Sequence, residues 1–267
     1  MKGTPVHERR TQILGLLQSE ESIRIADLSR VLGVSRETVR KDLYDLAAEG
    51  LLTTVRGGAV LTASNAETAY DLRLGTRREE KRRIARAAVG LVSPGDTVFL
   101  DYGTTTFALA AQLLRYKDLT VVTNALPIAQ LLAGTPSIQV MLPGGLVRGT
   151  ENSLYGPLTA RNLRHLHFDA GFFGCVGVDP AVGFTNPNLF ESETSALAMA
   201  RCGAVVMVVD HSKFGVVAAH VTAPADRPDL IVTDDQAPES MLHDFESHQV
   251  AVRVAAEAEP GRPDQEA

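Results

Sequence analysis

The stretch GVSRETVRKDLYDLAAEGLL, residues 33–52, has the pattern of a helix that turns one face to a protein core. Its apolar residues recur at helical spacing and are Val34, Val39, Leu43 and Leu46. Ser35 stands where a side chain can cap the first helical turn, and Gly33 is suited to end a preceding helix. The pattern therefore predicts a capped, amphipathic helix that begins near Ser35.

Two shorter helical patterns come before this stretch. Apolar residues recur at helical spacing from Glu8 to Gln18, and a second short helix is expected from Ile25 to Leu32. Two helices joined by a turn that contains glycine make a helix-turn-helix. The first part of the chain is therefore predicted to hold this motif.

The outward face of the third helix carries polar and basic side chains, which are Ser35, Arg36, Glu37, Thr38, Arg40, Lys41 and Tyr44. A DNA major groove accepts one α-helix, and side chains near its N-terminus reach base edges. We expect Arg36, Glu37 and Arg40 to contact bases or lie beside them. A three-helix module that binds another protein with a solvated charged face is the alternative.

The string LLTTVRGGAVL, residues 51–61, alternates as two short strands around Gly57 and Gly58. This pattern predicts a β-hairpin wing, with Arg56 near its tip in reach of a DNA phosphate. The 267-residue chain has a formal net charge of −6, so any DNA contact must come from a local basic surface.

Together, the run from Glu8 to Leu61 resembles the N-terminal domain of the DeoR family of sugar-metabolism regulators. The resemblance implies that the third helix reads operator DNA, with Arg40 and Lys41 at positions that are usually basic. Arg56 stands where the family commonly has histidine. We therefore expect a winged helix-turn-helix domain over residues 1–62.

Residues 63–75 are expected to form a linker, because periodicity is lost there. Beyond them, helical patterns alternate with continuous apolar runs, at Thr97–Leu100, Thr120–Val122, Ile138–Leu142, Ala170–Phe173, Ala204–Val209 and Leu230–Val232. Continuous apolar strands are typical of a parallel sheet covered on both faces. The fold class is therefore α/β, with a larger Rossmann-like domain after the small DNA-binding one.

Polar residues follow several of these strands. Thr104, Thr105 and Thr106 come after the first strand and open a helix, where backbone N–H groups can hold an anion. Lys213 follows the fifth strand, and Asp101 and Asn124 could bind sugar hydroxyls. Because parallel strands end at one crevice, these groups predict a phosphorylated polyol as ligand, although a Gly-Thr turn can also be simple helix capping.

The strings FLDYGTTT, TVVTNALPIA, MLPGG, YGPLTARNL, FFGCVGVD, GFTNP and VVDHSKFG resemble, in order, the DeoR sensor domain over residues 76–235. The resemblance implies a fold similar to ribose-5-phosphate isomerase and a phosphorylated sugar effector. It also implies that the following residues take part in the effector site: Asp101, Gly103, Thr104, Thr105, Thr123, Asn124, Gly144, Gly145, Glu193 and Lys213. The family commonly has lysine three residues after the acid at Glu193, and Ala196 stands there instead, so the site is expected to lose one cation.

Other features predict less. Cys175 and Cys202 are expected to be small buried hydrophobes, and His165 and His167 have no third metal ligand in view. Residues 236–267 are expected to form a C-terminal extension whose last part, from Ala255, is disordered. We expect a cytoplasmic protein without cofactor, metal or membrane contact.

The favoured hypothesis is a repressor, relieved by a sugar phosphate, that works as a homodimer or homotetramer. The first alternative is a sugar-phosphate isomerase with Asp101 or Glu193 as base and Lys213 as stabilising cation. The second is a nucleoid or scaffold protein that binds DNA regardless of sequence.

Overall fold

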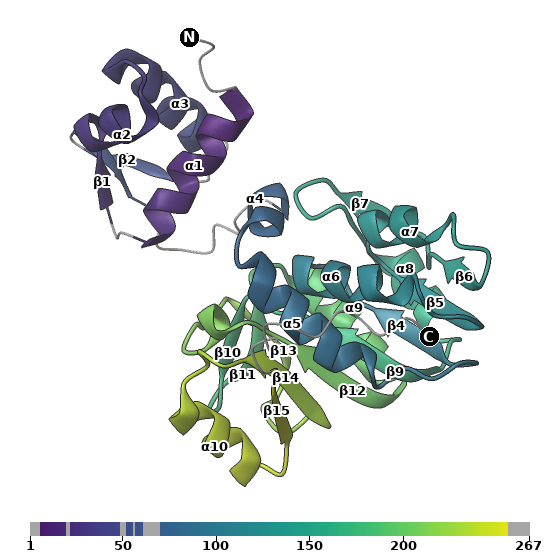
Figure 1. Cartoon of the computed structure of the whole chain (residues 1–267). Coiled ribbons are helices and arrows are strands. Elements are labelled where there is room, and N and C mark those ends of the chain that lie inside the picture. Colours follow the sequence, from purple (N-terminus) through teal and green to yellow (C-terminus); the bar gives the residue numbers. More distant parts are fainter. Residues whose placement is uncertain (1–5, 20–21, 49–51, 56, 61–69, 256–267) are drawn as a thin grey trace, which may run out of the picture. The chain divides into compact units, whose positions relative to one another are not determined.

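The computed structural model describes residues 6–19, 22–48, 52–55, 57–60 and 70–255, and it divides the chain into two compact units, 1–76 and 77–267. Figure 1 traces both units along the sequence.

The first unit is a winged helix-turn-helix. Its helices are α1 (Val6–Ser19), α2 (Ile25–Leu32), α3 (Arg36–Ala48) and α4 (Tyr70–Gly75), and its strands are β1 (Ser22–Arg24), β2 (Thr53–Val55) and β3 (Gly58–Val60). The three expected helices and the hairpin are confirmed. Gly33 ends α2 in the left-handed conformation, with φ 65°. The hairpin gains β1 as a third strand, so the sheet order is β1-β3-β2.

The three long helices share one core and a buried ionic cluster. The core contains Ile13 and Leu17 of α1, Leu28 of α2, and Val39, Leu43 and Leu46 of α3. Arg9 on α1 donates two hydrogen bonds to the Asp42 carboxylate on α3, at 2.6 and 3.1 Å. Arg10 approaches the same carboxylate at 3.6 Å and also pairs with Asp45. These ion pairs fix α1 against α3.

The second unit is built on parallel strands covered by helices. Its helices are α5 (Arg78–Val89), α6 (Thr104–Leu113), α7 (Leu126–Leu132), α8 (Pro157–Leu163), α9 (Leu189–Met199) and α10 (Glu239–Ser247), with a 3-10 turn η1 (His211–Lys213). The main strands are β4 (Thr97–Leu100), β5 (Leu119–Thr123), β6 (Ile138–Met141), β9 (Phe168–Phe173), β12 (Cys202–Val208), β14 (Leu230–Asp234) and β15 (Ala251–Ala255). Smaller strands are β7 (Leu146–Arg148), β8 (Ser153–Tyr155), β10 (Gly177–Asp179), β11 (Gly183–Asn186) and β13 (His220–Ala223).

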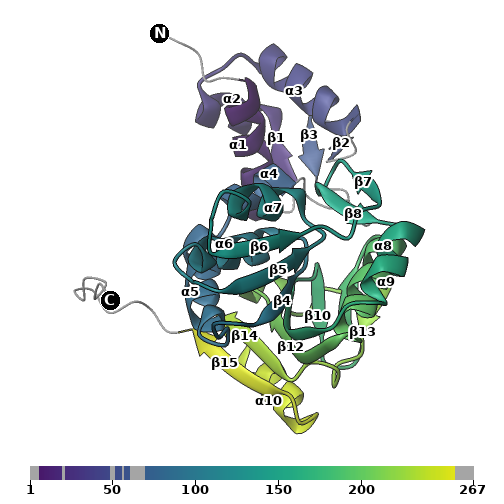
Figure 2. The same cartoon turned by 90° about the vertical axis from the view of Figure 1, so that its right-hand side faces the viewer.

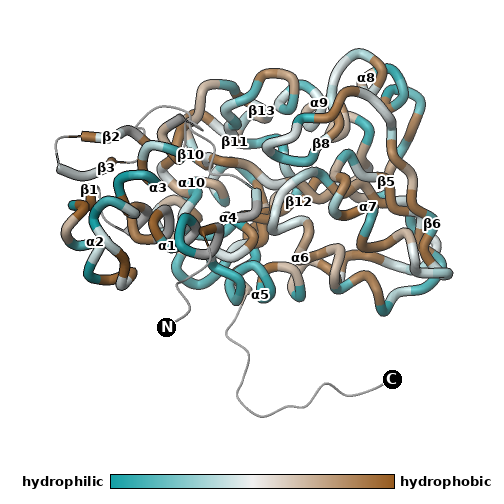
Figure 3. Tube along the Cα trace, turned by 90° about the horizontal axis from the view of Figure 1, so that it is seen from above, coloured by the Kyte–Doolittle hydropathy of each residue, from teal (hydrophilic) through white to brown (hydrophobic). Residues whose placement is uncertain are grey.

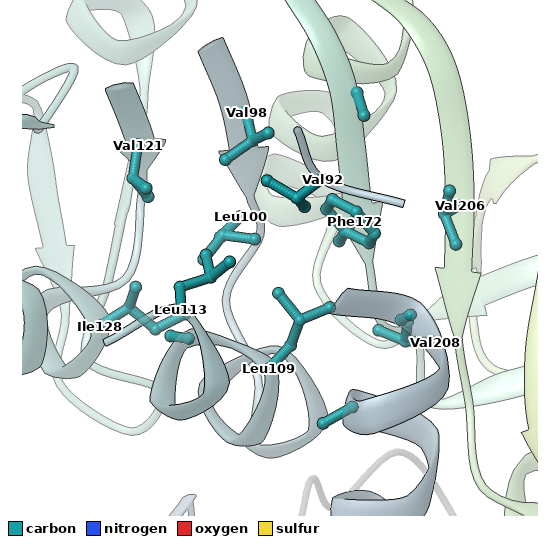
Figure 4. Packing of buried hydrophobic residues seen from close by; sticks show 14 of the residues in the cluster. Val92, Val98, Leu100, Leu109, Leu113, Val121, Ile128, Phe172, Val206 and Val208 are labelled. Atoms are coloured by element: carbon teal, nitrogen blue, oxygen red, sulfur yellow. The ribbon is translucent and has the colours of Figure 1, made fainter. Parts of the chain in front are cut away.

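The seven main strands form one parallel sheet in the order β15-β14-β12-β9-β4-β5-β6. Alternate residues along each strand face opposite layers: Val98 and Leu100 pack toward α5, α6 and α7, whereas Phe99 packs toward α8, α9 and α10. Figure 4 shows Leu109, Leu113 and Ile128 pointing from their helices onto the strand side chains. Hydrophobic stretches follow β5, β6 and β12 in Figure 3. The α/β fold class is thereby confirmed.

Two expected boundaries differ from the structure. The sheet does not end near residue 235, because α10 follows and β15 pairs in parallel with β14 from Leu230↔Ala251 to Asp234↔Ala255. The expected linker 63–75 is helical in its last part, as α4. The sequence pattern did not predict β15, because Ala251–Ala255 is an edge strand with most of its residues exposed and so lacks a continuous buried apolar run. The expected disorder after Ala255 concerns residues 256–267, which lie outside the described residues.

We expect Asp42→Ala to destabilise the first unit by about 3 kcal/mol, because it leaves the buried Arg9 guanidinium without its main partner. Asp27→Ala is the matched control, because it removes an ion pair to Arg30 on the exposed surface of α2. Urea unfolding, with amide hydrogen exchange on α1 and α3, measures both variants. An equal loss of unfolding free energy in Asp42→Ala and Asp27→Ala would contradict the structural role of the buried cluster.

Candidate functional site

The outer face of α3 is exposed and predominantly basic. Arg36, Glu37, Arg40, Lys41 and Tyr44 are all exposed, whereas Val39, Leu43 and Leu46 are buried. An open groove runs along this face between α3 and the first turns of α1. Arg40 pairs with Glu37 at 2.9 Å, so Arg36 and Lys41 leave the face with net positive charge. Such a face suits the negative phosphate backbone of DNA.

Ser35 and Thr38 build the start of α3. The Thr38 backbone N–H donates to Ser35 Oγ at 3.1 Å, and the two hydroxyl oxygens lie 2.8 Å apart. Both side chains therefore serve the expected helix cap. Arg56, the residue expected at the wing tip, lies outside the described residues; its neighbours Val55 and Gly57 are exposed.

The strand order changes direction where β4 and β9 are neighbours in the sheet. The chain adds β5 and β6 on one side of β4 and then returns to place β9 on its other side. The connections after β4 and β9 therefore leave in opposite directions, and a ligand crevice is expected at the carboxyl ends of the two strands; we use the word crevice for this region. Asp101 and Gly103 follow β4, and Cys175 follows β9.

Asp101 is the centre of a buried hydrogen-bond network in this crevice. Its carboxylate accepts from Ser195 Oγ at 2.6 Å, from Asn124 Nδ2 at 3.1 Å and from the Tyr102 backbone N–H at 2.9 Å. Burial raises the pKa of Asp101 to about 7, against the opposing effect of these hydrogen bonds, and the nearby charge of Glu191 adds to the rise. The network joins the ends of β4 and β5 to α9.

Glu191 extends this network toward the β7–β8 hairpin. Its carboxylate is fully buried and accepts from Arg148 of β7 and Ser153 of β8. Glu191 lies close enough to Asp101 for their charges to interact. The hairpin, α9 and the crevice are therefore linked by charged groups.

The turn after β4 leads directly into helix α6. Gly103 precedes α6 with φ 133°, a conformation that favours glycine, and Thr104, Thr105 and Thr106 form the buried first turn. Thr106 Oγ1 donates to the Gly103 carbonyl at 2.9 Å, so this hydroxyl is engaged within the turn. Thr104 and Thr105 remain the candidate hydroxyl donors at the N-terminus of α6.

The second and third expected loops are held by local contacts. Thr123 Oγ1 accepts from the Ala125 N–H at 3.1 Å, and the Gly144 carbonyl accepts from Thr159 Oγ1 at 2.6 Å. A Cβ at Gly145 would lie 2.0 Å from Thr159 Oγ1, so this residue must be glycine for the loop to approach α8. These three residues shape the loops around the crevice.

Lys213 ends the 3-10 turn η1, which follows β12, and its charge acts on groups at the ends of β9 and β12. Burial raises the pKa of the Cys175 thiol to about 12, the charge of Lys213 opposes the rise, and Asp210 and Asp101 add to it. Cys175 therefore has charged groups around it from β4 and β12, and a thiol with so high a pKa is unreactive.

Lys81 of α5 and Arg77, which precedes that helix, join Lys213 beside Asp210. Burial by itself would raise the pKa of Asp210, but Lys213, Lys81 and Arg77, together with a hydrogen bond from Ser212, lower it. Arg77 Nε lies 3.9 Å from the carboxylate. Lys81 is only 6% exposed, so its charge is held inside the unit rather than on a solvated helix face.

Glu193 does not enter the crevice. Its side chain is exposed, and the buried face of α9 consists of Glu191, Ser192, Thr194, Ser195, Ala198 and Met199. The acid in the network is therefore Glu191, two residues earlier and on the other side of the helix. Ser195, next to the half-buried Ala196, is the α9 residue that reaches Asp101.

Helical periodicity contained a signal for Glu191 and Ser195, because they stand four residues apart on the face that continues to Ala198. Lys81, Arg77 and Arg148 gave no such signal, because only the folded chain brings them to the crevice. In the described part of the chain, no helix is long and apolar enough to span a membrane.

Because the pKa of Asp101 is raised from 3.8 to about 7, the folded state holds this proton more tightly than the unfolded chain between these values. The associated stability is complete below about pH 4 and is lost as pH rises through 7. The shift corresponds to roughly 4 kcal/mol. We expect Asp101→Asn to flatten the fall in the free energy of unfolding from pH 5 to pH 8, measured by urea unfolding. Asp226→Asn, at an exposed carboxyl, should leave the slope unchanged, and an unchanged slope in Asp101→Asn would contradict the raised pKa.

Comparison with known proteins agrees with both units. Residues 9–65 match the DeoR-like helix-turn-helix domain, and residues 76–235 match the DeoR C terminal sensor domain. The HTH-type transcriptional regulator GolR of Listeria innocua is 34% identical over 249 residues, covering 93% of this chain and 98% of its own. The putative aga operon transcriptional repressor of Escherichia coli O157:H7 is 31% identical, covering 95% and 96%.

Two further proteins resemble this chain. The glycerol-3-phosphate regulon repressor of Escherichia coli K12 is 30% identical and covers 92% of this chain and 98% of its own. The solved ribose 5-phosphate isomerase A of Methanocaldococcus jannaschii aligns with 52% of this chain and 55% of its own, at 16% identity and a TM-score of 0.40. On the strength of the two domain matches and the full-length relatives, the chain belongs to the DeoR family of transcriptional regulators.

Proposed function

We propose that this regulator represses an operon of sugar metabolism in the cytoplasm and that a phosphorylated sugar relieves the repression. One observation carries the proposal: the crevice between β4 and β9 joins a cation and a helix N-terminus to buried carboxylate and amide groups. This combination suits a ligand with a phosphate at one end and hydroxyls at the other. The names of two relatives, repressors of the aga operon and of the glycerol-3-phosphate regulon, support it.

In the proposed DNA complex, α3 enters the major groove. Arg36 and Arg40 reach base edges, with Glu37 positioning Arg40 through their ion pair. Lys41 and Tyr44 lie further along the exposed face and meet the phosphate backbone, as does Arg56 of the wing. Ser35 and Thr38 act mainly by fixing the start of the helix.

We expect Arg40→Ala to weaken binding to the preferred site about 10- to 100-fold, because a bidentate base contact is worth roughly 1–3 kcal/mol. The site is first selected from randomised duplexes by the wild-type protein, and binding is then measured by fluorescence anisotropy. Binding to unrelated DNA should weaken less.

Arg82→Ala is the matched control, because Arg82 forms the same i,i+3 ion pair, with Glu79, on an exposed helix face of the sensor unit. It should bind like wild type. Lys41→Ala should weaken binding to every sequence and reduce the salt slope by about 0.9. A loss of the same size for selected and unrelated DNA in Arg40→Ala would contradict the base contact.

The proposed effector lies across the crevice. Its phosphate binds the α6 N-terminus, Thr104, Thr105 and Lys213, whereas its hydroxyls bind Asp101 and Asn124. Asn124 is fully buried, and its Oδ1 has no hydrogen-bond partner among the described residues, so it offers an acceptor to a ligand hydroxyl. Gly103, Thr106, Thr123, Gly144 and Gly145 shape the surrounding loops.

We expect a phosphorylated sugar to raise the apparent melting temperature of the protein, whereas its unphosphorylated form does not, since only ligands of the native state stabilise it. A thermal-shift screen of matched pairs measures this. Lys213→Gln should lower the affinity for the sugar phosphate that gives the shift at least about tenfold, because it removes the cation that pairs with the phosphate. Lys117→Gln, at an exposed lysine beyond α6, is the control. Equal shifts from both members of each pair would contradict phosphate recognition.

Two further properties belong to this proposal. The chain acts as a homo-oligomer, a dimer or tetramer, because one recognition helix covers few base pairs and paired half-sites multiply affinity.

The crevice binds its ligand without converting it, since Asp101 is committed to three hydrogen bonds and Glu193, the other base considered, is exposed. Interconversion of an aldose and a ketose phosphate by the pure protein would contradict this.

A further inference from the structure

We propose that two copies of this chain associate through an apolar face of the sensor unit formed by β7, α8 and α9. The face is defined by Leu146, Leu158, Leu189 and Phe190. The proposal deepens the homo-oligomeric state inferred above, on which it rests, by naming its surface. Figure 2 shows β7, β8, α8 and α9 following one another along one side of the sensor unit.

These side chains are large, apolar and open to solvent. Each is between 46% and 58% exposed, whereas the unit packs most of its large apolar residues into two cores; other exposed ones, such as Val217, Val221 and Val254, stand on other segments. Four such residues from three neighbouring elements form a patch of the kind that marks a protein interface. Isolated exposed leucines would not need this explanation.

The elements that carry the face adjoin one another. Leu146 Cδ1 would lie 3.5 Å from a Cβ added to Gly156, just before α8, and Leu158 Cδ2 would lie 3.8 Å from one added to Gly144, before β7. The Tyr155 and Phe190 rings are 5.8 Å apart, which joins β8 to α9. Leu146, Leu158 and Phe190 therefore lie on adjoining elements rather than scattered over the unit.

The charges beside the face indicate that the occupant is a second copy. Arg161 stands three residues after Leu158 on α8, and Glu193 stands three residues after Phe190 on α9; both are exposed. A twofold interface joins a surface to itself, so it needs groups of both signs on the same face. In such a dimer Arg161 faces the partner's Glu193, and the reverse pair forms at the same time.

The face also has a direct route to the crevice. Phe190 is followed by Glu191, whose buried carboxylate pairs with Arg148, and Arg148 stands two residues after Leu146 on the same side of β7. Glu191 interacts electrostatically with Asp101. A ligand that rearranges the Asp101 network therefore acts on residues adjacent to the interface, which couples effector binding to the arrangement of the two copies.

The first test is sedimentation velocity of the full chain over a range of concentrations. We expect a wild-type dimer or larger species, and at least a tenfold weaker association in Phe190→Asp and Leu158→Asp, because a charge replaces an apolar anchor at the interface. Val254→Asp is the matched control: Val254 is 46% exposed on β15, at the opposite edge of the sheet from β6. Unchanged association in both face variants would overturn the proposal.

A charge-reversal cycle tests the identity of the occupant. Arg161→Glu and Glu193→Arg should each weaken association at least about tenfold, because each places like charges opposite one another. The double variant should recover association to within a few-fold of wild type. Double-variant association as weak as that of the single variants would overturn the twofold arrangement.

Two measurements separate this proposal from the proposed function. Amide hydrogen exchange in β7 and α9 should slow as protein concentration rises; protection independent of concentration would mean that the face is covered within one chain, and would overturn it. The thermal shift with the effective sugar phosphate should persist in Phe190→Asp. If Phe190→Asp loses self-association but keeps the thermal shift with the sugar phosphate, the interface is supported. If the wild-type protein self-associates but no sugar phosphate shifts its melting temperature, only effector binding is contradicted.

Discussion

The position of β9 beside β4 is the constraint on which the sensor unit depends. The chain builds β4, β5 and β6 outward in one direction and then returns past β4 to continue the sheet with β9, β12, β14 and β15. Because every main strand is parallel, all carboxyl ends lie at one edge, and the reversal makes the ends of β4 and β9 the place where a ligand crevice is expected. Asp101, Cys175 and Lys213 meet at this crevice for that reason.

Ionisable groups are buried around the crevice, and each has polar or charged partners that offset at least part of the cost of its burial. Asp101 has three hydrogen-bond donors, Glu191 has Arg148 and Ser153, and Asp210 has three nearby cations. An uncompensated charge would be too costly in this low-dielectric environment, so the arrangement is held in place before any ligand arrives. A bound anion that changes the balance of charge at one of these groups must affect the others.

Helix α9 connects this network to the surface. Its inner face carries Glu191 and Ser195 toward the crevice, and its outer face carries Phe190 and Glu193. The two sets alternate along less than two turns of one helix, so a small displacement of α9 changes both. The first unit depends in a similar way on one buried group, Asp42, which holds α1 against the recognition helix α3 through Arg9 and Arg10.

The sequence alone determined the elements whose causes are local. The cap at Ser35, the turn at Gly33, the hairpin at Gly57 and Gly58, and six of the seven main strands follow from periodicity and turn chemistry over a few residues. Tertiary structure decided the partners. Ser195 reaches Asp101 across 94 residues of sequence, Glu191 rather than Glu193 enters the crevice, and Lys81 is buried beside Asp210. Local patterns cannot encode these contacts, because they depend on strand order and on which helix face the sheet covers.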